Sequence, residues 1–181
     1  GKGDLIIADK LVHASLIDAM QLSGAEFKRF RHNDAEHAAA LLTTHRKDYR
    51  HCLIITEGVF SMDGDTPPLA ALLEHAKAHD CQLIVDDAHG FGVLGEGKGL
   101  CAEQGIKDER IIHIGTFSKA MGSYGGYVCA SAEWIDYITN KARAAIYTTA
   151  LPPATIAANI AALQLISESG DLAKSARNHA N

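Results

Sequence analysis

The sequence has 181 residues, of which 47% are hydrophobic and 22% are charged, which is typical of a soluble globular protein and excludes disordered and fibrous classes. Its 17 Lys and Arg against 22 Asp and Glu give a formal net charge of -5. Because no long run of basic residues occurs, neither nucleic acid nor an anionic membrane is an expected partner.

Short β-rich runs alternate with helical patterns along the chain. This alternation predicts an α/β fold with three αβα layers and a mostly parallel sheet. Asp34 is a plausible N-cap, and Pro68 suits a first helical turn. We expect strands at Leu5–Ala8, Glu26–Phe30, Cys52–Thr56, Gln82–Val85, Ile111–Ile114 and Gly126–Ala130, and helices at about His13–Leu22, Asp34–Thr44, Pro68–Ala78, Ala132–Ala144 and Pro153–Glu168.

No repeat, low-complexity tract or flexible linker divides the chain, so it is expected to form one α/β unit. It begins at Gly1 close to an apolar strand and stops at Asn181 in a helical pattern, which suggests a fragment. No apolar run approaches the roughly 18 residues of a membrane span, and no signal-peptide pattern is present. We therefore expect a cytoplasmic location, with reduced and mostly buried thiols at Cys52, Cys81, Cys101 and Cys129.

Polar residues follow three of the expected strands. Open parallel sheets bind ligands at the carboxyl ends of their strands. The segments to examine are therefore Glu57–Asp65, Asp86–Gly92 and Thr116–Lys119.

The segment after the fourth strand carries Asp86, Asp87 and His89. Two carboxylates and an imidazole at the end of a buried strand are costly unless a cation or a protonated ring balances them. In the alternative interpretation, Asp86 or Asp87 simply caps the following turn.

Lys119 follows the next strand and lies among small hydroxyl residues and glycines. A lysine amine in such surroundings can form a Schiff base, and the hydroxyls of Thr116 and Ser118 can bind an anion such as phosphate. Together with an aspartate for a pyridinium nitrogen, these groups suggest pyridoxal phosphate (PLP) as cofactor.

Two motifs, at 86–99 and 115–122, resemble those of the α-oxoamine synthases, PLP-dependent enzymes of the aspartate aminotransferase superfamily (fold type I). The resemblance covers nearly the whole chain. It also includes the stretches at 13–15, 31–34, 57–65 and 146–154.

The resemblance implies roles for individual residues. Lys119 would carry the cofactor as a Schiff base and remove the substrate α-proton, and Asp86 would pair with the pyridine nitrogen. His89 would contact the phenolic oxygen of the ring, and His13 would stack on the ring face. The remaining implied cofactor contacts are Ser61 and Thr116, with Glu57 and Asp63 in a supporting role.

The stretches at 31–34 and 147–153 look most like the biotin-pathway member, which condenses L-alanine with pimeloyl-CoA or a pimeloyl-carrier thioester and releases carbon dioxide. Another α-oxoamine synthase, such as 2-amino-3-ketobutyrate CoA ligase, and a non-catalytic fragment or interaction subunit are the alternatives. The family forms homodimers, in which Thr148 and Thr149 could reach the partner's cofactor phosphate.

Family members are about twice as long as this chain. Residues 1–181 would therefore be the central part of the cofactor-binding large domain, without the N-terminal segment and the C-terminal small domain. Such a fragment is expected to be inactive alone.

Three patterns have other interpretations. Gly90–Gly95 matches the G-x-G-x-x-G dinucleotide fingerprint, but acidic residues precede it where phosphate would be repelled. His75 and His79 are spaced to hold a metal, yet no third ligand is evident, so a solvated helix face and no metal site are expected. His32 is interpreted as a surface residue, like the histidines at 37, 45 and 51.

Overall fold

A computed structural model describes residues 1–180. The chain divides into two compact units, Gly1–Asp86 and a second that starts at Asp87. That the chain forms one α/β unit stays a prediction. The division falls inside the uninterrupted run Gln82–His89, where no linker composition marks it.

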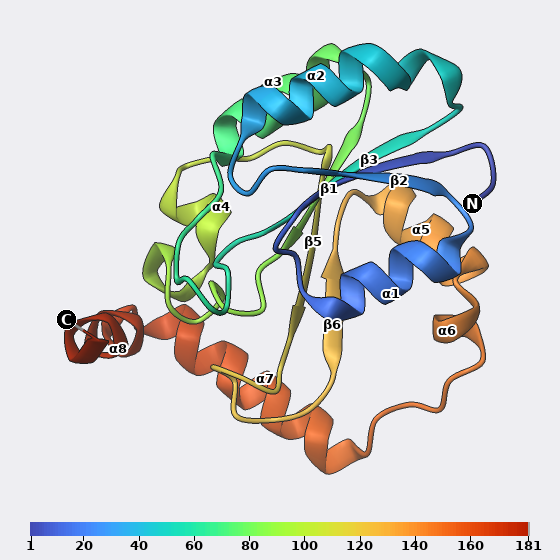
Figure 1. The fold of residues 1–181 in the computed structure, drawn as a ribbon. Coiled ribbons are helices and arrows are strands. Elements are labelled where there is room, and N and C mark those ends of the chain that lie inside the picture. Colours follow the sequence, from blue (N-terminus) through green and yellow to red (C-terminus); the bar gives the residue numbers. More distant parts are fainter. Residues whose placement is uncertain (181) are drawn as a thin grey trace. The chain divides into compact units, whose positions relative to one another are not determined.

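The first unit is built on four parallel strands (Figure 1). The central strands β1 and β3 pair with each other, β2 pairs with the outer side of β1, and β4 pairs with the outer side of β3. The strands are β1 (Leu5–Asp9), β2 (Glu26–Phe30), β3 (Cys52–Glu57) and β4 (Gln82–Asp86).

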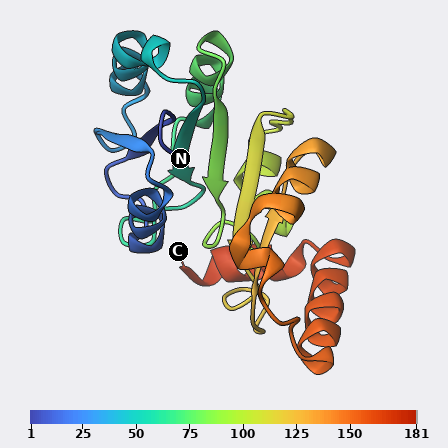
Figure 2. The same ribbon diagram turned by 90° about the vertical axis from the view of Figure 1, so that its right-hand side faces the viewer.

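Helices cover both faces of this sheet. Helices α2 and α3 pack side by side on one face, and α1 lies on the opposite face (Figures 1 and 2). The carboxylate of Asp34 accepts a 2.8 Å hydrogen bond from the backbone N–H of His37, which confirms the predicted N-cap. The helices are α1 (Ala14–Ser23), α2 (Ala35–His45), the 3₁₀ turn η1 (Arg46–Asp48) and α3 (Leu69–Ala78).

The core of the first unit explains why its central strands β1 and β3 are continuous apolar runs. Strand β1 is buried along its whole length, and Leu5, Ile7 and Ile54 are fully inaccessible to solvent. Strands that are covered on both faces lack the alternation of a half-exposed sheet. Leu69, Leu72 and Ala76 bury the inner side of α3 against this core.

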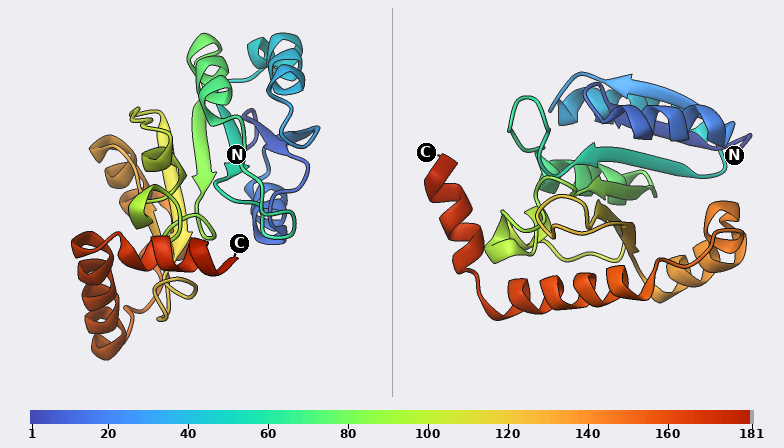
Figure 3. Two further views of the ribbon diagram at one scale, coloured as in Figure 1. Left: turned by 90° about the vertical axis from the view of Figure 1, so that its left-hand side faces the viewer. Right: turned by 90° about the horizontal axis from the view of Figure 1, so that it is seen from below.

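The second unit contains an antiparallel strand pair and several helices. Strand β5 (Ile111–Thr116) pairs with β6 (Gly126–Cys129), with His113 opposite Cys129 and Thr116 opposite Gly126. Helices α7 and α8 follow each other and run in different directions (Figure 3). The helical elements are η2 (Gly95–Gly97), α4 (Leu100–Glu103), α5 (Ala132–Lys141), α6 (Arg143–Ile146), α7 (Pro153–Glu168) and α8 (Asp171–Ala180).

Glu103 links α4 to η2 and to α8. One carboxylate oxygen accepts the backbone N–H of Gly95 at 2.6 Å, and the other pairs with Arg177 of α8 at 3.0 Å. The backbone hydrogen bond from Gly95 and the contact with Arg177 both lower the pKa of Glu103.

The predicted elements differ from the structure mainly at their ends. Pro68 is the N-cap of α3 rather than part of its first turn. The helix expected at 132–144 breaks at Ala142, whose ψ of 103° is extended, and continues as the short α6. The predicted α/β class with mostly parallel strand pairs is confirmed.

The four cysteines are free thiols, as predicted: Cys52, Cys81 and Cys101 are buried and Cys129 is exposed. Burial raises the pKa of Cys101 to about 12, and the charge of Asp87 adds to this effect. Within residues 1–180, each helix is too short or too polar to cross a membrane.

Candidate active site

The carboxyl edge of the first sheet is lined by acids. Asp9, Glu57 and Asp86 are the last residues of β1, β3 and β4. Glu57 and Asp86 are direct partners in the parallel register, so their side chains leave the same face of the sheet. Two neighbouring carboxylates create a negative potential that favours a cationic group of a ligand.

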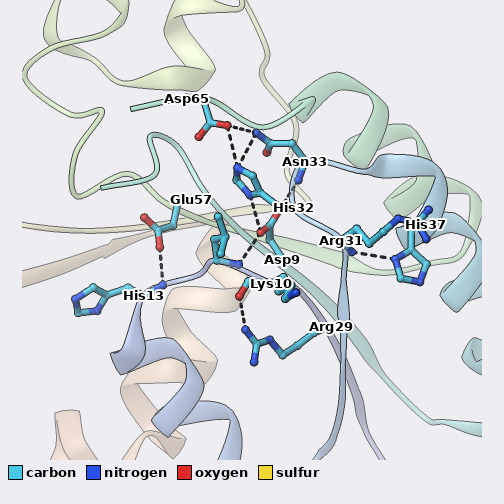
Figure 4. A network of polar contacts seen from close by, with 11 residues as sticks. Asp9, Lys10, His13, Arg29, Arg31, His32, Asn33, His37, Glu57 and Asp65 are labelled. Atoms are coloured by element: carbon cyan, nitrogen blue, oxygen red, sulfur yellow. Dashed lines mark hydrogen bonds and ion pairs between the residues drawn. The ribbon is translucent and has the colours of Figure 1, made fainter. Parts of the chain in front are cut away.

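His13 is held at this edge by Glu57. The buried Glu57 carboxylate accepts a 2.5 Å hydrogen bond from the backbone N–H of His13 (Figure 4). The imidazole caps α1 through Nδ1, which lies 3.2 Å from the backbone nitrogen of Ser15 and 2.8 Å from its hydroxyl. The ring is exposed, so one face can receive a flat ligand.

Ser61 lies in a short closed turn after β3. The backbone N–H of Phe60 donates to the carbonyl of Asp65 at 3.0 Å, and that of Gly64 donates to the carbonyl of Phe60 at 2.8 Å. The base of the turn is tied to β4, because the N–H of Gly58 donates to the carbonyl of Asp86 at 2.7 Å. Ser61 and Asp63 are exposed at the tip.

His32 is not a plain surface residue, and that interpretation of the sequence is wrong. Its Nδ1 lies 3.0 Å from a carboxylate oxygen of the fully buried Asp9, and its Nε2 lies 2.9 Å from Asp65 (Figure 4). Asn33 adds a backbone hydrogen bond to Asp9 and a side-chain bond to Asp65, both of 2.8 Å. Two hints in the sequence were an acid, Asp9, ending an otherwise apolar strand and the place of His32 within the stretch 31–34.

This network predicts a pH-dependent stability. Burial by itself lowers the pKa of His32, but the hydrogen bonds and charges of Asp9 and Asp65 outweigh it and raise the pKa above the ordinary 6.5. The imidazolium therefore stabilises the fold fully below pH 6.5, and this contribution is lost as the pH rises through the raised value. We expect the unfolding free energy to fall over that interval in the full-length protein.

The check is urea denaturation of the wild type and of His32→Gln between about pH 5.5 and pH 9, which brackets histidine titration. The fall should be absent from the variant. Equal pH dependence in the two proteins would show that other groups are responsible.

In the second unit, the capping interpretation fits Asp87. Its buried carboxylate accepts a 3.0 Å hydrogen bond from the N–H of Leu100, the first residue of α4. Its backbone carbonyl closes the next turn by accepting the N–H groups of Gly90 and Phe91. This structural role favours Asp86 over Asp87 as the carboxylate for a ligand. His89 lies half-buried in the turn that follows Asp87.

The position of Asp87 depends on Gly99. A Cβ at Gly99 would lie 1.8 Å from Asp87 Oδ2, and the φ of +93° at Gly99 is in a region that side chains rarely adopt. Gly99→Ala is therefore expected to destabilise the protein by about 2–4 kcal/mol, from backbone strain and displacement of a hydrogen-bonded carboxylate.

Gly105→Ala is the matched control, because Gly105 also has a positive φ, of +64°, but its added Cβ would meet nothing within 4 Å. It should cost only about 1–2 kcal/mol. Urea midpoints measure both variants, and equal losses would mean that contact with Asp87 has no weight.

Lys119 lies in a loop that is closed by hydrogen bonds to the carbonyl of Gly125. The hydroxyl of Thr116 donates to the carbonyl of Gly125 at 3.0 Å, and the N–H of Phe117 donates to the same carbonyl at 2.9 Å. The hydroxyls of Thr116 and Ser118 are 2.7 Å apart. Lys119 itself is exposed, so its amine can reach a ligand.

The glycines at 90–95 serve packing rather than dinucleotide binding. Gly92 has a φ of +83°, and its Cβ would lie 2.3 Å from the Cβ of Ala120, next to Lys119. The run folds into turns and does not open an α-helix, which begins only at Leu100. A pyrophosphate site of the dinucleotide type needs that helix N-terminus. The structure thus agrees with the sequence argument against a nicotinamide enzyme.

The predicted site residues fall into two groups. In the first unit, Glu57 contacts His13 and neighbours Asp86, while Ser61 lies in the following turn. In the second unit, Thr116 and Lys119 share one loop. His89 lies in the turn after Asp87.

Comparison with known proteins gives consistent matches. The family model "Aminotransferase class I and II" matches residues 1–181. An 8-amino-7-oxononanoate synthase of Beijerinckia indica subsp. indica is 50% identical over 174 residues, which are 96% of this chain and 45% of that protein. The chain thus spans about half the length of the curated relatives it matches.

Two solved structures share the fold. A serine palmitoyltransferase from S. paucimobilis with a bound PLP–myriocin aldimine matches with a TM-score of 0.86 and 35% identity, over 92% of this chain and 43% of that chain. The crystal structure of 8-amino-7-oxononanoate synthase from Francisella tularensis matches with a TM-score of 0.75 and 36% identity, over 90% and 47%. These matches confirm the predicted fold class.

Proposed function

Since the chain belongs to the aminotransferase class I and II family, we propose that it is the cofactor-binding part of a PLP-dependent acyltransferase. The whole protein would condense L-alanine with pimeloyl-CoA, or a pimeloyl-carrier thioester, to 8-amino-7-oxononanoate, carbon dioxide and CoA in biotin biosynthesis. The observation that carries this proposal is the sequence identity of 50% and 51% to two 8-amino-7-oxononanoate synthases over nearly the whole chain.

The side chains present suit PLP. When bound, PLP supplies an electron sink for the negative charge that develops at the amino-acid α-carbon. Asp86, beside Glu57, offers a carboxylate to a protonated pyridine nitrogen. The hydroxyls of Thr116 and Ser118 offer hydrogen bonds to a phosphate.

Lys119 has two tasks in this proposal. Its exposed Nζ holds the cofactor covalently, and in the neutral state the same amine takes the α-proton of the substrate. The closed loop from Thr116 to Gly125 limits the positions that the amine can occupy. A restricted amine supports proton transfer, because the transfer requires the amine to lie within hydrogen-bond reach of the substrate.

Three further residues would orient the ring and the phosphate group. His13 would stack on the ring, since its imidazole is exposed and its backbone is fixed by Glu57. His89 would donate to the phenolic oxygen, and Ser61 would add a hydroxyl contact from its turn. These assignments rest on the resemblance and on the exposure of the side chains.

The setting of the chain is also a proposal. We place residues 1–181 in the central part of the cofactor-binding large domain, because relatives of about twice this length match over less than half of their own sequence. The protein would be a cytoplasmic homodimer. Thr148 and Thr149, which are exposed, would contact the partner's cofactor phosphate.

The first experiment is an absorbance spectrum of the full-length protein with PLP, before and after borohydride reduction. Reduction should shift the visible band, and mass spectrometry should find the pyridoxyl mass on the peptide that contains Lys119. No band in the full-length protein would overturn the assignment of the cofactor.

Turnover then tests the substrates. Release of the CoA thiol should require both L-alanine and pimeloyl-CoA, and mass spectrometry should identify 8-amino-7-oxononanoate. Glycine with acetyl-CoA and L-serine with palmitoyl-CoA are the control pairs. Preference for either pair would keep the cofactor chemistry and move the protein to another α-oxoamine synthase activity.

A further inference from the structure

His32 contacts both ends of the turn that carries Ser61. The Phe60 ring meets the imidazole edge to face, with centroids 4.5 Å apart and planes at 89°. The Nε2 atom of the imidazole lies 2.9 Å from a carboxylate oxygen of Asp65. Phe60 and Asp65 are also joined by a backbone hydrogen bond. The His32 side chain therefore contacts both residues that close the turn.

The other side of His32 is anchored in the core. Asp9 has no exposed surface, and its carboxylate also accepts the N–H groups of Leu11 and Asn33 at 2.8 Å each. Asn33 adopts a left-handed backbone with φ of 53°, a conformation that asparagine tolerates better than most residues. Asp9 is thus held by several hydrogen bonds in the core, and His32 connects it to the turn.

The two carboxylate contacts of the imidazole favour its charged form. A neutral imidazole has one N–H and one bare nitrogen, and a bare nitrogen facing a carboxylate would be repelled. Both ring nitrogens face carboxylate oxygens, at 3.0 Å and 2.9 Å, and these contacts are shorter than the 3.3 Å between Nε2 and the amide nitrogen of Asn33. Only the imidazolium donates to both acids, and such charge-assisted hydrogen bonds are the stronger kind.

A bound cation could satisfy the same acids. Side-chain atoms of His32, Asp63 and Asp65 lie within 4.8 Å of one another, close enough to share an ion. However, the Nε2 that would bind the ion already faces Asp65, and the imidazolium supplies the positive charge. Asp63 is the further acid near the ring.

We propose that His32 is a positioning residue: as an imidazolium bridging Asp9 and Asp65, it fixes the turn that presents the Ser61 hydroxyl to the cofactor. This inference rests on the proposed function, because it takes Ser61 as a PLP contact. It assigns His32 no direct contact with cofactor or substrate. Its effect on PLP binding must therefore pass through Ser61.

A double-mutant cycle in the full-length protein tests this route. Apo-protein variants Ser61→Ala, His32→Gln and the double variant are titrated with PLP at pH 7. Each single change should weaken PLP affinity about tenfold, the value of one hydrogen bond. The double variant should be no weaker than Ser61→Ala, because the turn then has no hydroxyl left to position.

His37→Ala is the matched control. His37 is also half-buried, and its Nδ1 accepts a 2.9 Å hydrogen bond from the backbone of Arg31, but it makes no contact with the turn. This variant should lose stability without losing PLP affinity. If His32→Gln does not fold, Asp65→Asn removes the negative charge from the same bridge at the Asp65 side chain, which is 43% exposed.

The outcomes separate the two proposals. If the two losses of PLP affinity multiply to about a hundredfold in the double variant, the positioning role is wrong and the PLP assignment stands. Unchanged affinity in both His32→Gln and Asp65→Asn would do the same. Absence of PLP attachment in the wild type would remove the proposed function, and the inference with it.

Discussion

Replacing Lys119 by Ala is expected to abolish the borohydride-reducible attachment of PLP while the fold stays intact. Lys119 is exposed, so truncation opens no cavity, and the Thr116 to Gly125 loop keeps its hydrogen bonds. The hydroxyls of Thr116 and Ser118 remain, so non-covalent binding of PLP should persist at lower affinity. Loss of the amine as a base should lower turnover by at least about 10²–10⁴-fold.

The measurement combines the absorbance spectrum, mass spectrometry after reduction and a urea denaturation curve. Lys141→Ala is the control, because Lys141 is an exposed lysine of α5 in the same unit and should leave label and turnover unchanged. A reducible adduct that persists in Lys119→Ala would refute the assignment of this lysine. Equal loss in Lys141→Ala would point to a general defect.

Asp86→Asn is expected to leave PLP attached and to cripple removal of the alanine α-proton. The amide keeps the size of the side chain at the end of β4, but it removes the negative charge that keeps a pyridine nitrogen protonated. Without that proton the ring accepts electrons poorly. Loss of one such electrostatic contact should slow the step by about 10²–10³-fold.

Exchange of the alanine α-proton in deuterated water, followed by NMR, isolates this step from acyl transfer. Glu57→Gln is an informative companion, since Glu57 neighbours Asp86 but binds the backbone of His13. It should weaken PLP binding more than it slows exchange per bound cofactor. Undiminished exchange in Asp86→Asn would contradict the assigned pairing.

Periodicity and strand propensity were enough to predict all six strands in residues 1–180. The predicted and observed bounds of Glu26–Phe30 agree, and the strands ending at Glu57 and Asp86 are each one residue longer than expected. Those extra residues are acids, which a hydrophobic pattern assigns to a loop. They remain in the strands because their backbone groups continue the parallel ladder.

Long-range polar contacts were beyond the reach of local patterns. His32 contacts Asp9 and Asp65, which lie 23 and 33 residues away in the sequence. In the linear sequence His32 stands among polar residues, so it reads as exposed. Likewise, the roles of Gly92 and Gly99 follow from side chains elsewhere in the second unit.

The uneven burial of the thiols gives the chain a built-in attachment point for a reporter. Cys52, Cys81 and Cys101 are buried, which keeps maleimides and iodoacetamides away from their sulfur atoms, whereas Cys129 is open to solvent on β6. A fluorophore or spin label should therefore couple at one position of this chain without engineered cysteines. Its signal would follow the second unit alone.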